Sequence, residues 1–159
     1  MANWVQNVIV ISPESLISAK SNRRLKLLVK NIQDMCWMAD QGFREQIDDN
    51  GYFGVSREKD DSIWVYADTK WKPPTEVFEI WASKGLIFEA YYYDIENRSF
   101  VGKWCSTGLA VHFEMEPRSI ANYIRNLQKL LPADIDRVFD VIYNLTKDRS
   151  DLQDLVDRI

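Results

Sequence analysis

Two consecutive prolines, Pro73 and Pro74, impose the strongest constraint on how this chain of 159 residues can fold. Proline fixes φ and has no backbone N–H, so neither the middle of a sheet nor the interior of a helix can run through the pair. The preceding segment, 63–67, is apolar at every position, which is typical of a strand that is central or covered on both sides. Proline suits the first turn of a helix, and the apolar residues after the pair share one helical face before Gly85. The prolines therefore predict a strand, a sharp turn and a helix.

Strand-like and helix-like segments alternate along the rest of the chain. Short β-branched or aromatic runs predict strands at 4–11, 52–55, 86–93, 100–104 and 109–113. Apolar residues at helical spacing predict a helix from Pro13 to about residue 40, which Ser21-Asn22 can divide into two pieces, and three helical segments after Pro117. This order predicts an α+β fold, with an antiparallel or mixed sheet and helices on one face over 1–115. A C-terminal helical extension over 116–159 is expected to pack on that domain.

Three motifs in the middle of the chain resemble a known family. They are Ala67-Asp-Thr-Lys-Trp-Lys-Pro-Pro74, Leu86-Ile-Phe-Glu-Ala-Tyr-Tyr-Tyr93 and Phe100-Val-Gly-Lys-Trp104, with an aromatic helix after the first. Together with the opening Met1-Ala2-Asn3-Trp4, they are similar to the YubB-type ferredoxin-like domain family, a domain of unknown function that phages and plasmids carry. The resemblance implies a ferredoxin-like sheet and a mobile-element origin, and it supplies no catalytic residues. The helices after Pro117 have no counterpart in the family's pattern.

Charge is distributed unevenly along the chain. Residues 1–30 carry five cations against Glu14 alone, a net charge of +4, so the remainder carries −8 of the total of −4. From Pro132 onward seven aspartates face four cations, a net charge of −3. An acidic end can meet a basic partner, although two solvated helix faces of opposite sign explain the same pattern. The candidate protein-binding residues are Asp134, Asp136, Asp140, Asp151, Asp154 and Asp157.

Aromatic residues support two interpretations. Trp71, Trp81 and Trp104 are expected to form a core cluster beneath the proline turn, because each indole buries a large apolar area. Aromatic side chains on a sheet can also stack nucleic-acid bases. This alternative, a module that binds single-stranded nucleic acid, uses sheet residues on the face opposite Phe88 together with the basic first helix: Tyr91, Tyr93, Lys103, Arg23, Arg24, Lys26 and Lys30. The negative net charge and the missing RNP motif favour protein binding over this alternative.

Residues suited to catalysis or metal binding are few. His112 is the only histidine, and a dyad with Cys105 across the 106–108 turn is conceivable. Pairing of residue 105 near residue 111 would, however, turn the two side chains apart. Cys36 lies on an apolar helical face and is expected in the core. The spacing of a calcium loop fails in 48–59 and no Walker glycine pattern precedes residue 102, so we expect no metal, no cofactor and no enzyme activity.

The lengths of the apolar runs and the charges near the start of the sequence indicate where the protein acts in the cell. Its apolar runs fall short of the ~18–20 residues that a membrane span needs, and its start has no basic region typical of a secretory signal. We expect a cytoplasmic protein without membrane contact, in the host cell if a phage encodes it. The expected function is a non-enzymatic phage or plasmid accessory protein that binds a host or phage protein, such as an inhibitor of a CRISPR-type defence system. A homodimer through an exposed stripe on 150–159 is a further option.

Overall fold

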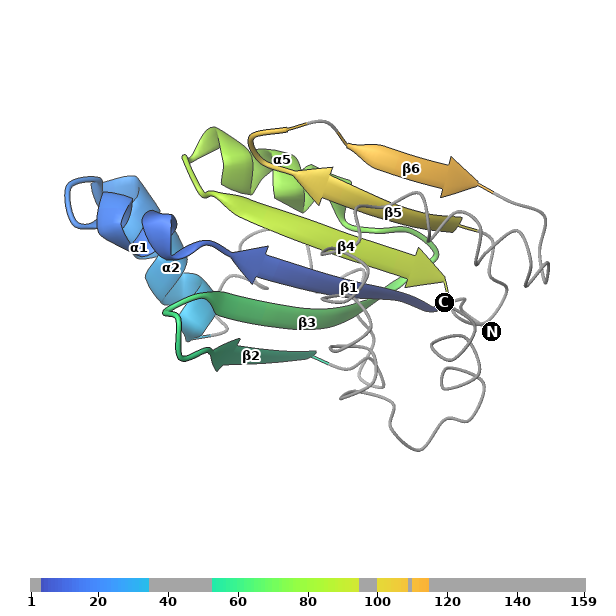
Figure 1. Cartoon of the computed structure of the whole chain (residues 1–159), viewed down its shortest axis with the longest axis horizontal. Coiled ribbons are helices and arrows are strands. Elements are labelled where there is room, and N and C mark those ends of the chain that lie inside the picture. The colour runs from blue at the N-terminus through green and yellow to red at the C-terminus, as the bar shows by residue number, and fades with distance from the viewer. Residues whose placement is uncertain (1–3, 35–52, 95–99, 109, 115–159) are drawn as a thin grey trace.

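The computed structural model describes residues 4–34, 53–94, 100–108 and 110–114 of the chain (Figure 1). These residues form six strands and three helices. In chain order the elements are β1 (Trp4–Ile11), α1 (Pro13–Ala19), α2 (Arg23–Gln33), β2 (Phe53–Arg57), β3 (Ile63–Lys70), α5 (Thr75–Ser83), β4 (Phe88–Asp94), β5 (Phe100–Cys105) and β6 (Val111–Glu114).

All six strands belong to one antiparallel sheet in the order β2-β3-β1-β4-β5-β6 (Figure 1). β1 is an inner strand and pairs with β3 over its whole length, from Trp4 opposite Lys70 to Ile11 opposite Ile63. β3 lies between β1 and β2, which α1 and α2 separate in sequence. In the same way β1 lies between β3 and β4, which α5 separates in sequence. The predicted α+β class with an antiparallel sheet is confirmed.

The helix ends follow local sequence signals. The Ser12 side chain accepts a hydrogen bond from the Glu14 backbone N–H at 3.3 Å, and Pro13 opens α1. The Asn22 side chain accepts from the Leu25 N–H at 3.2 Å, so the expected break at Ser21-Asn22 does separate two helices. Gly85, at φ +90°, ends α5 in a left-handed conformation that glycine adopts without strain.

One face of the sheet packs against α2 and α5. Phe88 lies at the centre of an aromatic cluster in this layer: its ring centroid is 5.4 Å from that of Trp104, 5.8 Å from Trp81 and 5.9 Å from Phe78. Close packing of large rings supplies most of the apolar burial in such a core. The core combines side chains from β1, β3, β4, α1, α2, α5 and the loop between α5 and β4: Ile9, Ile11, Ala19, Leu25, Leu28, Val29, Ile32, Ile63, Val65, Ala67, Val77, Phe78, Trp81, Leu86, Phe88 and Ala90.

The prediction that three tryptophans cluster in the core is wrong for Trp71. Trp81 is fully buried and Trp104 packs against the core, as predicted. Trp71 instead is 61% exposed and has φ +68°, so its indole lies outside the core. The turn before Pro73 reverses the chain so tightly that residue 71 cannot follow the inward-facing positions of β3.

The strand predicted at 63–67 continues to Lys70, and its burial alternates along its length. Ile63, Val65 and Ala67 are buried, whereas Trp64 and Tyr66 on the other face are half-buried. The strand is apolar on both faces because it is an inner strand with neighbours on both sides. The predicted extension over 116–159, the helix beyond residue 34 and Cys36 lie outside the described residues.

Candidate protein-binding surface

Helices α1 and α2 form a hairpin that begins where β1 leaves the sheet (Figure 1). Leu25, Leu28 and Ile32 anchor α2 to the core, because they lie at helical spacing on its inward face and are at most 3% exposed. This anchoring turns the opposite side of α2 toward solvent. The polar face of the hairpin is therefore exposed, while the buried face holds α2 against the core.

A groove of about 380 Å³ runs between the two helices. On α2 it is lined by positions 26, 29, 30 and 33, which share one helical face, and on α1 by positions 16, 19 and 20. Leu16, Ala19 and Val29 supply apolar lining, and Ala19 and Val29 are themselves largely buried. The remaining lining residues are polar or charged: Lys20, Lys26, Lys30 and Gln33. The groove thus combines an apolar floor with three cations.

The hairpin surface around the groove is basic and partly apolar. Over 13–34, Lys20, Arg23, Arg24, Lys26 and Lys30 face only Glu14 and Asp34, a net charge of +3. All five cations are exposed. Two large apolar side chains are also exposed on the hairpin, Ile17 at 66% and Leu27 at 60%.

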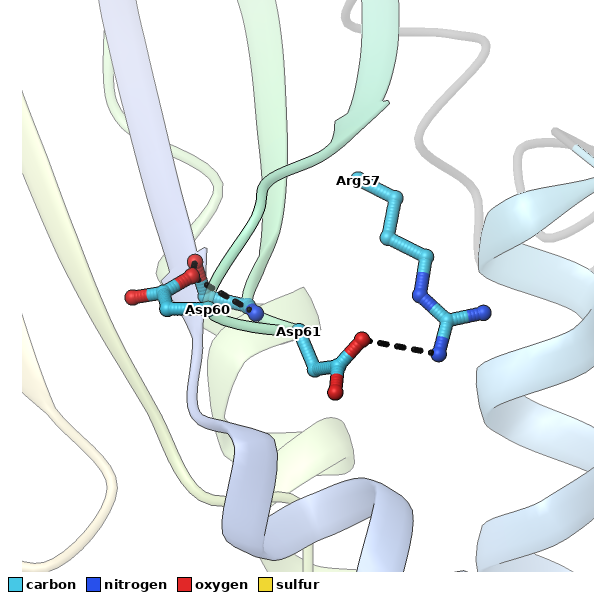
Figure 2. Close-up of polar contacts among 4 residues, drawn as sticks. Arg57, Asp60 and Asp61 are labelled. Atoms are coloured by element: carbon cyan, nitrogen blue, oxygen red, sulfur yellow. Dashed lines mark hydrogen bonds and ion pairs between the residues drawn. The ribbon is translucent and has the colours of Figure 1, made fainter.

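A second cavity, of about 370 Å³, lies where β1, β3 and β4 meet the start of α1. Glu14, Asp60 and Glu89 line it together with Ser12 and Ser62. Asp60 Oδ1 accepts hydrogen bonds from the backbone N–H and the hydroxyl of Ser62, at 3.0 and 2.5 Å (Figure 2). These bonds hold the β2–β3 turn, in which Arg57 Nη2 also lies 3.2 Å from Asp61 Oδ1 (Figure 2). Asp60 therefore has a structural role in this turn, and Glu89 accepts a hydrogen bond from the Tyr91 hydroxyl. No group of residues suited to a metal ion occurs within the described ranges.

The residues of the nucleic-acid alternative do not form one surface. Arg23, Arg24, Lys26 and Lys30 lie on α2, which packs on the face of the sheet that carries Phe88. Tyr91 and Tyr93 lie on the opposite face, since Tyr91 pairs with Val8 and Lys103 while Ala90 pairs with the core residue Ile9.

The expected exposed stacking platform is also wrong, because Tyr91 and Tyr93 are each 1% exposed. The Tyr91 hydroxyl donates to Glu89 Oε2 at 2.6 Å, and the Tyr93 hydroxyl donates to Gln6 Oε1. Lys103 Nζ lies 5.6 Å from the centroid of the Tyr91 ring and 3.9 Å from Glu89 Oε1. Rings held in this way offer no open face to a base. Alternation along β4 predicts which face they occupy but not whether that face is covered.

The conceivable dyad of Cys105 and His112 is absent. Cys105 pairs with Glu89, whereas His112 pairs with Gly102, which pairs with Tyr92, so the two side chains point to opposite faces of the sheet. The register places Val111 opposite Lys103, not near Cys105 as expected. His112 Nδ1 lies 2.8 Å from the Tyr92 hydroxyl, and burial raises the pKa of that hydroxyl to about 12. His112 is therefore placed to form a hydrogen bond with Tyr92 across β5.

Sequence reasoning found the cations of the hairpin but not the groove. On α2 the groove is lined by positions 26, 29, 30 and 33, of which only Val29 is apolar, so hydrophobic periodicity does not mark this side of the helix. The predicted acidic contacts, Asp134, Asp136, Asp140, Asp151, Asp154 and Asp157, lie outside the described residues.

Comparisons of the chain with protein-family models, with curated proteins and with solved structures gave no match. Within the part of the chain that the structure describes, no helix has both the length and the apolar composition required to cross a bilayer.

Proposed function

We propose that the chain is a non-enzymatic binding protein whose α1–α2 groove takes an acidic segment of a partner protein. The observation that carries this proposal is the groove itself, where an apolar floor lies among Lys20, Lys26 and Lys30. An apolar anchor side chain on the partner would fill the floor, while carboxylates around it would pair with the lysines.

A protein partner fits this groove better than a nucleic acid does. A phosphate backbone would use the lysines but would leave the floor of Leu16, Ala19 and Val29 without an apolar contact. Base stacking requires open aromatic faces, and Tyr91 and Tyr93 are buried. The separation of Cys105 from His112 supports a function that does not depend on catalysis.

The finer fold assignment that we propose is a ferredoxin-like core extended by β5 and β6. Its support is the order β2-β3-β1-β4, in which both helical connections join strands that lie on either side of a third. The resemblance to the YubB-type family supports a phage or plasmid accessory protein that acts in the host cytoplasm. The partner class that we propose is a host protein, with a defence effector of the CRISPR type as the specific case.

The test uses fluorescence anisotropy with three labelled probes. The first is an acidic helical peptide with a single leucine, the second is the same peptide with alanine in place of leucine, and the third is oligo(dT). We expect the leucine peptide to bind about tenfold more tightly than the alanine peptide, because only the former fills the apolar floor. Oligo(dT) binding that matches or exceeds peptide binding would favour the nucleic-acid alternative.

Charge reversal on α2 provides a matched comparison. Lys30→Glu changes a groove lysine, and Arg24→Glu changes an exposed cation of the same helix that does not line the groove. At physiological ionic strength, where screening limits each charge to about 8 Å, we expect Lys30→Glu to weaken peptide binding about tenfold and Arg24→Glu to weaken it less than about twofold. Equal losses for the two variants would mean that general charge, not the groove, attracts the peptide.

A further inference from the structure

Trp71 combines two features that are rarely found together. Its backbone has φ +68°, a left-handed conformation that is a genuine outlier for a bulky side chain. Its side chain is 61% exposed, although tryptophan is largely buried in most proteins. The Lys72 N–H donates to the Lys70 carbonyl at 2.8 Å, so residue 71 is the central residue of a γ-turn. A γ-turn with a positive φ at this position is the rare and strained form.

The surrounding structure holds this turn firmly. The Thr69 hydroxyl donates to the Lys72 carbonyl at 2.7 Å and accepts from Asn7 Nδ2 at 2.9 Å. Thr69 and Asn7 are at most 1% exposed, and the Asn7 amide group also donates to the Ala67 carbonyl at 2.9 Å. After the turn, Pro73 is buried. The strained conformation is therefore specified by buried hydrogen bonds on the side of the turn that faces the sheet.

The tight turn explains why residue 71 has a positive φ, but it does not explain why the residue is a tryptophan. Glycine adopts φ +68° without strain, and asparagine adopts it with little. Burial in the core does not account for the tryptophan, since 61% of the residue is exposed. An exposed side chain at a strained backbone position that buried hydrogen bonds hold in place points to a contact outside the chain.

We infer that Trp71 is the anchor of a second protein-contact site, which inserts its indole into an apolar pocket on a partner protein. Tryptophan is the residue type most enriched among interface residues that dominate binding. The residues that follow fit the rim of a protein interface, because they carry both charges: Lys72 Nζ lies 3.8 Å from Glu76 Oε1, and Glu79 is exposed on α5. Ile80, 38% exposed and one helical turn after Glu76, adds apolar surface to α5.

The same charges argue against nucleic acid as the occupant. Lys72 is already paired with a carboxylate, and the exposed carboxylates of Glu76 and Glu79 would repel phosphates. The site is also distinct from the α1–α2 groove. Trp71 follows Lys70, which pairs with Trp4, whereas α1 begins after Ile11 at the other end of β1. Seven residue steps along a strand separate the two ends by about 23 Å.

The test joins a stability measurement to a site-directed cross-link on the full chain. Trp71→Gly removes the indole and relieves the backbone, so we expect its urea midpoint to equal or exceed that of the wild type. A benzoylphenylalanine at position 71, irradiated in bacterial lysate, should give one protein adduct that the same probe at Ser83, at the far end of α5, does not give. Unlabelled wild type should suppress this adduct at a concentration about tenfold lower than Trp71→Gly requires, and Trp71→Phe should retain much of the suppression.

Each other outcome would overturn the inference. A clear loss of stability in Trp71→Gly would assign the indole a structural role. No adduct, or an adduct that both competitors suppress equally, would mean that no partner depends on Trp71. A nuclease-sensitive adduct would assign the turn to nucleic acid, and an adduct of twice the chain mass would assign it to a second copy.

Discussion

Because Gly102 has no side chain, the Tyr92 side chain can lie across β5 and reach His112 on β6. These three residues lie opposite one another on β4, β5 and β6. A Cβ atom on Gly102 would lie 2.3 Å from both Cζ and the hydroxyl oxygen of Tyr92 and 2.6 Å from Cε2. The ring crosses the glycine backbone at van der Waals distance, and its hydroxyl then meets His112 Nδ1 at 2.8 Å. We therefore expect Gly102→Ala to displace Tyr92.

The size of the effect follows from what the ring would lose. Ordinary contact with a Cβ begins near 3.4 Å, so the ring would have to move by about 1 Å in a site where only 4% of Tyr92 is exposed. The move would break the hydrogen bond to His112, worth about 0.5–1.5 kcal/mol, and disturb the packing against Phe100 and His112, whose ring centroids lie 6.2 and 5.7 Å away. Alanine is better than glycine in a strand by about 0.5–1 kcal/mol, which offsets part of the loss. A net destabilisation of about 1–2 kcal/mol is expected.

Urea unfolding of a double-mutant cycle measures this directly. Gly102→Ala is compared in the wild type and in Tyr92→Leu, whose shorter side chain does not reach the glycine. Only the gain of about 0.5–1 kcal/mol from alanine should remain in Tyr92→Leu, so the difference between the two backgrounds should be about 1.5–3 kcal/mol. Gly108→Ala serves as the control, because its Cβ would meet only Cys105, at 3.5 and 4.0 Å, and should be nearly neutral. The reasoning is refuted if Gly102→Ala is as harmless as Gly108→Ala, or if it is equally destabilising in both backgrounds.

Three further changes test other parts of the fold. Burial raises the pKa of Tyr92 to about 12, so the stability linked to its neutral hydroxyl is fully present below pH 10 and is lost as the pH rises from 10 to 12. Chemical denaturation should show a steeper alkaline loss of stability for the wild type than for Tyr92→Phe. Gly85→Ala should lower the free energy of unfolding by about 1 kcal/mol, because φ is +90° and no neighbour lies within 4 Å to compensate, whereas Gly85→Asn should lower it less. Phe88→Ala should remove about 3–5 kcal/mol of stability by calorimetry, since the ring contacts Phe78, Trp81 and Trp104 in the core.

Helix boundaries could be predicted here because their causes are local. Ser12 and Asn22 cap helices with their own side chains, and Gly85 ends α5 through its own backbone freedom. The alternation of residues along β4 likewise predicts that Tyr91 and Tyr93 share a face opposite to Phe88. These signals act over a few residues, so a single sequence contains them.

Features that depend on distant residues could not be predicted in the same way. The pairing of β1 with both β3 and β4 brings together residues about 60 and 80 positions apart, which no local pattern specifies. The burial of Tyr91 and Tyr93 depends on what covers that face, and the exposure of Trp71 depends on hydrogen bonds from Asn7, far away in the sequence. For the candidate site, the cations of α2 could be predicted, whereas the groove required the packing of α1 against α2.

The positions of the two proposed contact sites limit the partners that can use both. Helices cover one face of the sheet, and on the other face Val8, Tyr91 and Tyr93 are buried while Trp64 and Tyr66 are half-buried. The α1–α2 hairpin follows one end of β1 and Trp71 lies near the other end, and the two ends of this strand are about 23 Å apart. A short peptide that fills the groove does not span this distance, whereas an interface of standard size, about 800 Å² on each partner, is wide enough to span it. If one partner uses both sites, the free-energy losses from Lys30→Glu and Trp71→Gly should add in the double variant, because residues this far apart share no contacts.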